Sequence, residues 1–493
     1  MPLLGIGSVA LQQDEGIRMD HTHFLAELQA IVGDTGVVTE ELALERYTRE
    51  WRGKYLSGAI AAVRPSNTQQ VSEVVKLCAA NGISITPQGG NTGLVGGSIP
   101  VEPAREIVLS LDRMNAVEDV DPDGNTMLVQ AGCILADVQA AAERCDRLFP
   151  LSLGAEGSCR IGGNLSTNAG GINVIRYGNT RDLVLGLEVV LADGRIWNGM
   201  NRLRKDNTGY DLKHLFVGSE GTLGIITRAV LKIFPRPKDR LTAWLACESP
   251  EACLEALNMM RERLGDAIIA GEIIPAIAME QTLRHIEDTS PPINPIPPWS
   301  LLIEVGVFDE AGAIRDTLDY VLQEAVSREV LYDGTIAQNL TQAAQFWRIR
   351  EAIPEAEAKS GPSIKHDVSV PVHRVAELIE RGSALLEELY PGSRPVPFGH
   401  LGDGNLHFNL CAPTEAVGDP AAEADFLNAW SRINMAFHDL VREMNGSISA
   451  EHGIGQLKKD ELARTADEVG ISLMQTIKAA LDPQNIFNRG KIF

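Results

Sequence analysis

Apolar and polar positions in the first part of the chain predict short strands separated by single helices. An apolar run at 59–63 is followed by a helical pattern over 68–80 and a second apolar run at 83–86, which ends in a glycine-rich stretch. We expect an earlier helix to begin after Asp20, whose carboxylate can cap it. This order predicts a strand, helix, strand, loop unit.

Further along, two alternating segments flank the turn residues 121–125 and predict a hairpin. The same patterns predict a helix and two longer strand regions before Pro235 and Pro237, and we place the first domain boundary at these prolines. The predicted elements are the helix 136–143, strands within 183–197 around the Asp193-Gly194 turn, and a strand over 225–234.

After residue 236 strands and helices alternate in a different order, which predicts a separate α+β layer with antiparallel strands. A proline-rich loop at 289–299 interrupts it, and the last hundred residues give a strand pair, a helix, a strand and two closing helices. The predicted strands are 241–248, 267–274, 300–307, a pair across 399–409, and 446–450. The predicted helices are 250–264, 275–285, 311–327, 336–352, 372–389 and 422–443.

The fold class predicted from these patterns is α+β, in four parts. Residues 1–18 form a flexible tail, 19–236 a first domain, 237–445 a second domain with an antiparallel sheet, and 446–493 a C-terminal helical segment. The family resemblance given below implies that this last segment packs back towards the first domain.

Composition narrows the possible partners. The 493 residues carry 66 acidic and 44 basic side chains, a net charge of −22, so we expect no nucleic-acid or anionic membrane surface. An anionic ligand then needs a local positive site. The 7 cysteines form no C-x-x-C pair, which indicates reduced thiols and a cytoplasmic protein. No apolar run approaches the ~20 residues of a membrane-spanning helix, and the first residues do not resemble a signal peptide.

Three glycine-rich segments lie in the first predicted domain: PQGGNTGLVGG at 87–97, GSCRIGGNLSTNAGG at 157–171 and VGSEGTLGIIT at 217–227. Successive backbone N–H groups without Cβ atoms nearby can surround a phosphate. One such segment is equally consistent with a turn that binds nothing. Three together predict a large nucleotide.

These segments, with RYGNTRDLVLGLEVVLADG, resemble the FAD-binding half of the vanillyl-alcohol oxidase type flavoproteins, in their D-2-hydroxyacid dehydrogenase branch. The resemblance implies a two-subdomain FAD-binding fold. It implies that residues 89–93 and Ser98 cradle the pyrophosphate, that 163–171 line the flavin, and that Gly221 and Ile226 contact the adenosine or ring side. Because no histidine lies between His23 and His214, we expect non-covalent FAD. The predicted cofactor residues are Pro87, Gly89, Gly90, Asn91, Thr92, Gly93, Gly97, Ser98, Gly154, Ser158, Gly162, Gly163, Asn164, Thr167, Asn168, Gly170, Gly171, Gly221, Ile226 and Asn488.

A second cluster of chemistry-bearing residues follows. In GHLGDGNLHFN, His400 and His407 flank a turn, and in a hairpin we expect them to face each other across the strands. SAEHGIG places Glu451 and His452 beside two glycines. A His-His-Glu set suits Zn²⁺ or Mn²⁺ with an open position. The resemblance independently implies His400, His407 and Glu451 as metal ligands and His452 as a neighbour of the substrate hydroxyl.

A carboxylate substrate needs cationic donors. Arg350 offers a bidentate fork and Lys365 a point charge, and the resembling family has an arginine and a lysine at these positions. Asn409 projects from the same strand face as His407, and we include it in the catalytic set. Pro354 stands where hydroxyglutarate-oxidising members carry a threonine, although Lys365 matches that branch better than the D-lactate branch.

The function predicted is oxidation of a D-2-hydroxy acid to the 2-keto acid, with D-2-hydroxyglutarate the first choice and D-lactate or glycolate the alternatives. His452 takes the hydroxyl proton beside the metal and the flavin takes the hydride. An oxidase, a metallohydrolase using the same ligands, and a redox-inert FAD-fold binding protein stay open. We expect an electron-transfer flavoprotein, quinone or cytochrome as electron acceptor, and a homodimer as the default assembly.

Overall fold

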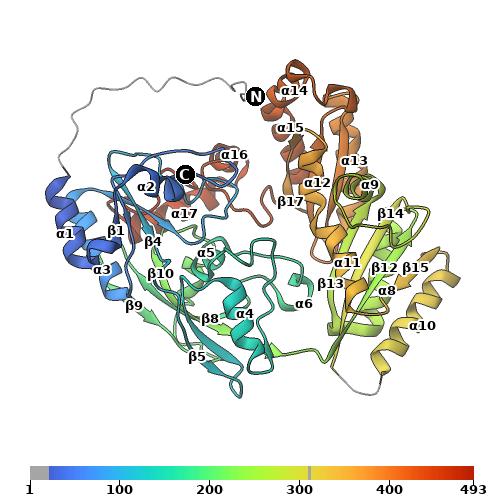
Figure 1. Ribbon diagram of the computed structural model, residues 1–493, viewed down its shortest axis with the longest axis horizontal. Coiled ribbons are helices and arrows are strands. Elements are labelled where there is room, and N and C mark those ends of the chain that lie inside the picture. The colour runs from blue at the N-terminus through green and yellow to red at the C-terminus, as the bar shows by residue number, and fades with distance from the viewer. Residues whose placement is uncertain (1–20, 309–311) are drawn as a thin grey trace.

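The computed structural model describes residues 21–308 and 312–493. The predicted tail at 1–18 and the predicted cap Asp20 lie outside these ranges. The first helix, α1 (Thr22–Val32), has His21 as its N-cap residue, and His21 makes no side-chain capping bond. Figure 1 shows two bodies side by side, which we call the first body (α1 to β11 with α16 and α17) and the second body (β12 to α15).

The first body opens with a four-stranded sheet in the order β1-β2-β4-β3, in which β2, β4 and β3 run parallel. The strand predicted over 59–63 is reduced to β2, and β4 was not predicted. Asn67 caps α3 through its side chain, which explains why that helix begins where the pattern indicated. The elements are η1 (Asp34–Gly36), β1 (Val37–Val38), α2 (Glu41–Thr48), β2 (Ala62–Val63), α3 (Thr68–Asn81), β3 (Ser84–Gln88) and β4 (Glu106–Ser110).

A five-stranded antiparallel sheet in the order β5-β6-β10-β8-β9 completes the first body. The predicted hairpin is confirmed as β5 and β6, and β7 pairs with β11 beside the sheet. The elements are β5 (Val117–Asp121), β6 (Thr126–Gln130), α4 (Leu135–Glu143), β7 (Arg147–Leu148), α5 (Ile161–Thr167), α6 (Val174–Tyr177), β8 (Val184–Val190), β9 (Ile196–Gly199), α7 (Lys213–Phe216), β10 (Ile225–Lys232) and β11 (Phe234–Pro235).

The second body is built on an eight-stranded antiparallel sheet, in the order β15-β12-β14-β13-β18-β19-β16 with β17 also on β19. Alternate residues of β12 enter different cores: Leu245 packs with α8 and α13, whereas Trp244 packs with α9 and α11. Its strands are β12 (Asp239–Cys247), β13 (Ile268–Pro275), β14 (Trp299–Val307), β15 (Asp333–Ile336), β16 (Ser363–Ile364), β17 (Asp367–Ser369), β18 (Arg394–His400) and β19 (Asn405–Cys411).

Helices therefore cover both faces of this sheet. The predicted helix 336–352 was too long, because β15 ends at Ile336 and the Asn339 side chain caps the helix that follows. The helices are α8 (Pro250–Leu264), η2 (Gly265–Ala267), α9 (Ala276–His285), α10 (Ala313–Ser327), α11 (Leu340–Glu351), α12 (Ile353–Lys359), η3 (Val372–Arg374), α13 (Val375–Leu389), η4 (Thr414–Ala416), α14 (Pro420–Asn428) and α15 (Trp430–Glu443).

After α15 the chain crosses back to the first body. The strand predicted over 446–450 is wrong: this stretch makes one isolated bridge, from Ser447 to Ser369. The two predicted closing helices are present as α16 (Lys459–Thr465) and α17 (Glu468–Leu481), in red beside the blue elements in Figure 1. Phe487 bridges to Ile85 and joins the core of the first body. The domain boundaries after residues 236 and 445 stay predictions.

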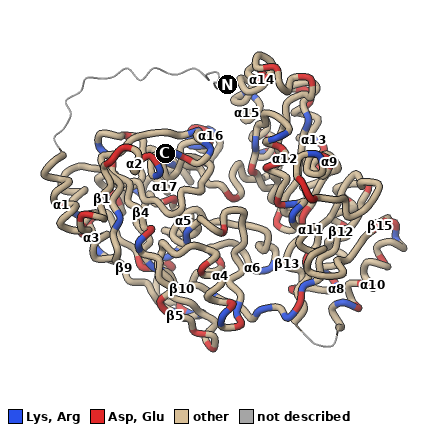
Figure 2. Tube along the Cα trace, viewed as in Figure 1, with Lys and Arg blue, Asp and Glu red and all other residues tan. Residues whose placement is uncertain are grey.

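The predicted α+β architecture is confirmed, with mixed and antiparallel sheets and many helices. Within the described ranges, no helix is both long and apolar enough to cross a membrane. Lys and Arg are interspersed with Asp and Glu over both bodies (Figure 2).

Candidate active site

Two of the predicted FAD-binding segments pack backbone against backbone. A Cβ built on Gly90 would lie 2.1 Å from the Ser158 carbonyl oxygen, and one on Gly89 would lie 3.4 Å from the Gly163 nitrogen. Only glycine permits so close an approach at position 90. The segments at 87–97 and 157–171 therefore form one surface.

Several predicted glycines face open space from this surface. Cβ atoms built on Gly93, Gly154 and Gly163 would meet no atom within 4 Å. A glycine-lined cradle that side chains would fill fits a cofactor whose phosphates and ring system lie against backbone. These residues fit FAD.

The third segment joins the same surface. Asn488 donates from Nδ2 to the carbonyl oxygen of Gly97 at 2.9 Å and to that of Glu220 at 2.6 Å. Gly221 has φ +71° and packs on Pro87. The remaining predicted cofactor residues, all in or beside the three segments, are Asn91, Thr92, Ser98, Gly162, Asn164, Thr167, Asn168, Gly171 and Ile226.

Several of these polar side chains make internal bonds. Ser98 donates to Asn91 Oδ1 at 2.8 Å, Thr167 Oγ1 donates to the Gly163 carbonyl at 3.0 Å, and Asn164 Nδ2 contacts Cys159 Sγ. These bonds stay within the segments at 87–98 and 157–171 and stabilise their conformation.

The two histidines of the predicted hairpin lie close together but are not directly opposite. β18 and β19 pair so that His400 faces Asn405 and His407 faces Phe398. The expectation that the histidines face each other is therefore wrong in register. They are diagonal neighbours on one sheet face, with ring centroids 5.7 Å apart.

Glu451 lies between the two histidines. Its carboxylate oxygens are 3.6 Å from His400 Nε2 and 3.9 Å from His407 Nε2. Burial lowers the pKa of His407 well below its ordinary value, which favours the neutral imidazole that binds metals. Burial also raises the pKa of Glu451 to about 7, with the His400 charge opposing and Asp367 adding. Two imidazoles and a carboxylate fit a divalent cation.

Asp367 and His452, the first missed from the sequence, complete this cluster. One donor atom from each of Asp367, His407, Glu451 and His452 can be chosen so that all lie within 4.8 Å of one another, and this group does not include the predicted ligand His400. Asp367 Oδ2 accepts the backbone N–H of His452 at 2.9 Å and lies 3.3 Å from its Nδ1, and Asp367 Oδ1 accepts from Asn405 at 3.0 Å. Because these bonds engage both of its oxygens, Asp367 is better suited to orient His452 than to bind a cation.

Glu272, also missed, connects His400 with Arg350. This fully buried carboxylate lies on β13, where its backbone pairs with His400. One oxygen lies 2.7 Å from His400 Nδ1 and the other accepts from Arg350 Nε at 2.7 Å. Burial lowers the pKa of His400, but Glu272 outweighs it and raises that pKa to about 9. A carboxylate on Nδ1 turns Nε2 toward Glu451.

Arg350, at the end of α11, is 6% exposed and stacks on Phe398. Among the described residues, only its Nε has a hydrogen-bonding partner, so its two terminal nitrogens are available to a ligand.

The other predicted cation, Lys365, lies near Asn409 and a third missed carboxylate. Glu357 on α12 accepts from Asn409 at 2.7 Å and from Lys365 at 3.3 Å. Pro354, in place of the threonine, occupies the first turn of α12. Lys365 is therefore partly neutralised and points to the same side of β19 as Asn409.

The two predicted sites meet at Gly170. A Cβ on this glycine would lie 3.2 Å from Glu451 Oε1. The glycine surface and the metal cluster are thus neighbours, although their residues lie far apart in the chain.

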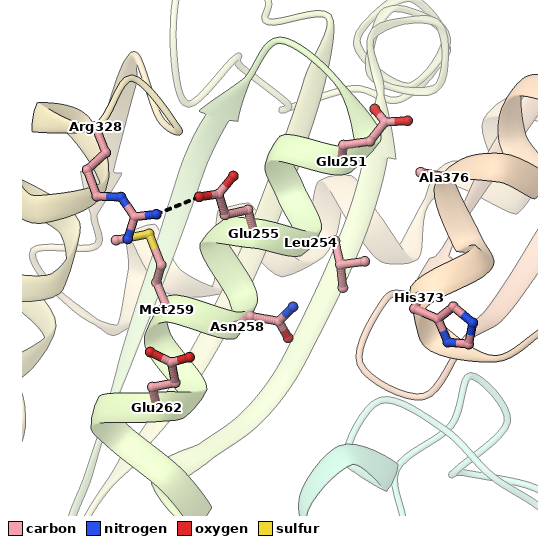
Figure 3. A pocket seen from close by; sticks show the side chains of 9 residues that line it. All are labelled: Glu251, Leu254, Glu255, Asn258, Met259, Glu262, Arg328, His373 and Ala376. Atoms are coloured by element: carbon pink, nitrogen blue, oxygen red, sulfur yellow. Dashed lines mark hydrogen bonds and ion pairs between the residues drawn. The ribbon is translucent and has the colours of Figure 1, made fainter.

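A separate hollow of about 400 Å³ lies on α8, beside η3 and α13 (Figure 3). Arg328 donates to Glu255 across its edge at 2.8 Å. None of the predicted site residues lines it, so it is distinct from the candidate active site. The lining residues are Glu251, Leu254, Glu255, Asn258, Met259, Glu262, Arg328, His373 and Ala376.

Two family models match the chain. The FAD binding domain covers residues 59–199, and the C-terminal domain of FAD linked oxidases covers residues 236–492. The fold is similar to that of 4-ethylphenol oxidase from Gulosibacter chungangensis, with a TM-score of 0.73 and 18% identity over 97% of this chain and 98% of that one.

Named relatives are similar over most of their length. D-2-hydroxyglutarate dehydrogenase of Xanthomonas citri pv. viticola is 38% identical over 95% of this chain and 96% of its own. The mitochondrial D-2-hydroxyglutarate dehydrogenase of Arabidopsis thaliana is 38% identical over 94% and 80%. A putative mitochondrial D-lactate dehydrogenase of Schizosaccharomyces pombe is 36% identical over 91% and 84%.

These names contradict the predicted cytoplasmic location, because the relatives from rice, Arabidopsis, zebrafish, rat and cattle are named as mitochondrial enzymes. The scattered cysteines on which the prediction depended are all free, and they are equally compatible with another reducing compartment. The family prediction, in contrast, is confirmed by both family models and by the relatives. The chain belongs to the FAD-linked oxidases, in their D-2-hydroxyacid dehydrogenase branch.

Proposed function

We propose that the protein is an FAD-dependent dehydrogenase that oxidises D-2-hydroxyglutarate to the 2-keto acid, assisted by a divalent metal. The contact between Gly170 and Glu451 carries this proposal, because it joins the glycine surface to the metal ligands. A hydroxy acid bound at the cluster would then stand beside the cofactor. The names of the relatives supply the substrate.

FAD held by the three glycine segments would accept the hydride from the α-carbon. A Zn²⁺ or Mn²⁺ ion held by His400, His407 and Glu451 would lower the pKa of the substrate hydroxyl. We expect the flavin to be non-covalent and the electrons to leave to an electron-transfer flavoprotein, quinone or cytochrome. The predicted homodimer stays a default.

His452 is suited to take the hydroxyl proton. Its Nδ1 faces the Asp367 carboxylate at 3.3 Å, which leaves Nε2 for the substrate. A carboxylate on one imidazole nitrogen fixes the ring and the tautomer, so that the other nitrogen can act as a base.

The cations bind the substrate carboxylates. Arg350 lies next to the metal cluster through Glu272 and suits the α-carboxylate, for which its two terminal nitrogens form a fork. Lys365 lies between β16 and β17, shares the Glu357 carboxylate with Asn409 of β19, and suits the distal carboxylate of a dicarboxylic acid. Two cations at separate places favour the longer substrate.

The decisive experiment is anaerobic bleaching of the bound flavin by D- and L-2-hydroxyglutarate, lactate, malate and glycolate. We expect fast bleaching by D-2-hydroxyglutarate, and loss of turnover on chelation while the flavin stays bound. A colourless purified protein would favour the metallohydrolase. Bleaching only by L-isomers, or full activity after exhaustive metal removal, would contradict the proposal.

D-lactate is a second candidate because of one observation. Glu357 already pairs with Lys365, and Pro354 removes a hydroxyl that hydroxyglutarate-oxidising members have, so the distal contacts are weaker than in those enzymes. A higher kcat/KM for D-lactate than for D-2-hydroxyglutarate in the same panel would identify D-lactate as the preferred substrate.

A further inference from the structure

The loop that carries Glu451 and His452 is held from both bodies at once. It lies where the chain crosses between α15 and α16, which belong to different bodies (Figure 1). Asp367 of the second body accepts the backbone N–H groups of Glu451 and His452 at 3.0 and 2.9 Å. Glu220 of the first body accepts those of Ile454 and Gly455 at 2.7 and 2.8 Å. Two carboxylates thus bind four amides of one short loop.

Glu220 is itself fixed to the predicted flavin segments. Its N–H donates to the Ser166 carbonyl in α5 at 2.8 Å, and its own carbonyl accepts from Asn488. Its φ of +52° lies in the left-handed region, which few residues with a side chain adopt. These backbone contacts fix the position of Glu220 relative to the predicted flavin segments.

The loop approaches Glu220 too closely for any residue but glycine. A Cβ on Gly453, where φ is +78°, would lie 2.8 Å from Glu220 Oε1. A Cβ on Gly455 would lie 2.3 Å from the Val95 carbonyl oxygen, in another flavin segment. Because Gly453 and Gly455 have no side chains, the loop can lie this close to Glu220 and Val95.

Asp367 has a corresponding anchor in the second body. It lies on β17, directly across from His407 on β19, and Asn405 donates to its other oxygen. Lys458 is near both carboxylates: its Nζ donates to the Ile448 carbonyl at 2.7 Å. Burial lowers the pKa of Lys458, and Asp367 and Glu220 oppose this shift.

We propose that Glu220 is a positioning residue for the oxidation: together with Asp367 it fixes Glu451 and His452 relative to the flavin segments. This inference rests on the proposed function. Because the loop takes one anchor from each body, loosening either anchor moves the base and a metal ligand against the cofactor. Displacement by about 1 Å is enough to slow a positioned reaction about 100-fold.

Glu220→Gln tests this inference. The amide keeps the shape but replaces one acceptor with a donor, which faces a backbone N–H. We expect the rate constant of anaerobic flavin reduction at saturating D-2-hydroxyglutarate to fall about 10- to 100-fold, with FAD content, metal content and substrate Kd unchanged.

Glu106→Gln is the matched control. Glu106 is also a carboxylate of the first body that accepts two backbone amides, but they belong to Val101 and Glu102, at 2.8 and 3.0 Å, and not to the catalytic loop. We expect it to lower Tm without slowing flavin reduction. A wild-type rate in Glu220→Gln, or equal slowing in Glu106→Gln, would overturn the role of Glu220.

Hydrogen exchange separates failure of this inference from failure of the proposed function. We expect the amides of Ile454 and Gly455 to exchange faster in Glu220→Gln. The amides of Glu451 and His452 should also exchange faster, because the loop has lost one of its two carboxylate anchors. If no hydroxy acid bleaches the wild-type flavin, the function fails whatever the exchange shows. If exchange is confined to 454 and 455, positioning of His452 by Glu220 fails.

Discussion

The glycine surface and the metal cluster differ in which part of the chain forms them. The glycine surface is built from backbone. Glycines such as Gly93 and Gly163 leave open space beside it because they have no side chain. The metal cluster is built from side chains, two of which are held by buried carboxylates, as Glu272 holds His400 and Asp367 holds His452. In the proposed function the glycine surface holds a large, extended cofactor, and the metal cluster fixes a few atoms.

The difference has a consequence for what each region tolerates. The segments of the glycine surface meet largely through backbone atoms, which the replacement of a side chain in the cluster leaves in place. The cluster depends on partners far away in the chain: Glu272 and His400 are 128 residues apart. We expect single side-chain changes to damage the two regions in separable ways.

The largest effect expected is that of His407→Ala, which removes a predicted metal ligand while the glycine surface stays intact. We expect kcat/KM to fall about 1000-fold or more, because a bound metal supplies several kcal/mol of charge stabilisation. Metal analysis should show loss of the ion, and the flavin absorbance should persist. Joint loss of flavin and metal would show that the two regions are not separable.

Gly163→Ala tests the opposite region. No atom lies within 4 Å of the added methyl and the residue is in α5, so we expect the flavin-free protein to be as stable or about 0.5–1 kcal/mol more stable. The methyl enters the proposed flavin space, where overpacking costs about 1–3 kcal/mol, or about 5- to 150-fold in the Kd for FAD. Fluorescence titration and thermal unfolding measure both quantities. An unchanged Kd would contradict the placement of the flavin.

Glu272→Gln measures how far the cluster depends on its supporting carboxylate. We expect metal affinity to fall about 10- to 100-fold, because an amide orients His400 poorly. KM for the substrate should rise as well, since Arg350 loses the same partner. Glu357→Gln is the control at the other end of the site and should leave metal affinity unchanged. Competition with a chromogenic chelator provides the readout.

The smallest effect expected is that of Lys365→Met, which keeps the bulk and removes the charge. Lys365 is one-third exposed and already paired with Glu357, so the loss should be near 1 kcal/mol, about fivefold in KM for D-2-hydroxyglutarate. KM for D-lactate should not change. Equal changes for both acids would show that Lys365 does not bind a distal carboxylate.

Motifs local in sequence were the predictable part of this protein. The three glycine segments and the pairs around His400 and Glu451 each lie within a short stretch, the longest being 157–171, so their spacing carries a signal. Hairpin β5–β6 and helix α3 were predictable for the same reason, because turn residues and caps are local.

The supporting carboxylates had no such signal. Glu272 stands alone in an apolar strand and Asp367 in a strand of three residues, and their partners are reached only through sheet pairing. A charged residue within a buried run such as IIAGEIIP is the hint that was available, because burial of an unpaired carboxylate is too costly. The register of His400 and His407 also depends on turn geometry that spacing alone does not specify.

The contact of Ile486 and Phe487 with the first body has a consequence for biosynthesis. Both side chains are buried in its core, and Phe487 bridges to Ile85 in a sheet made some four hundred residues earlier. A ribosome that has released the first 236 residues has therefore produced a body that still lacks part of its interior. The edge strand β3 has no Phe487 beside it until the whole second body has been synthesised. We therefore expect the cofactor to bind after translation and not during it.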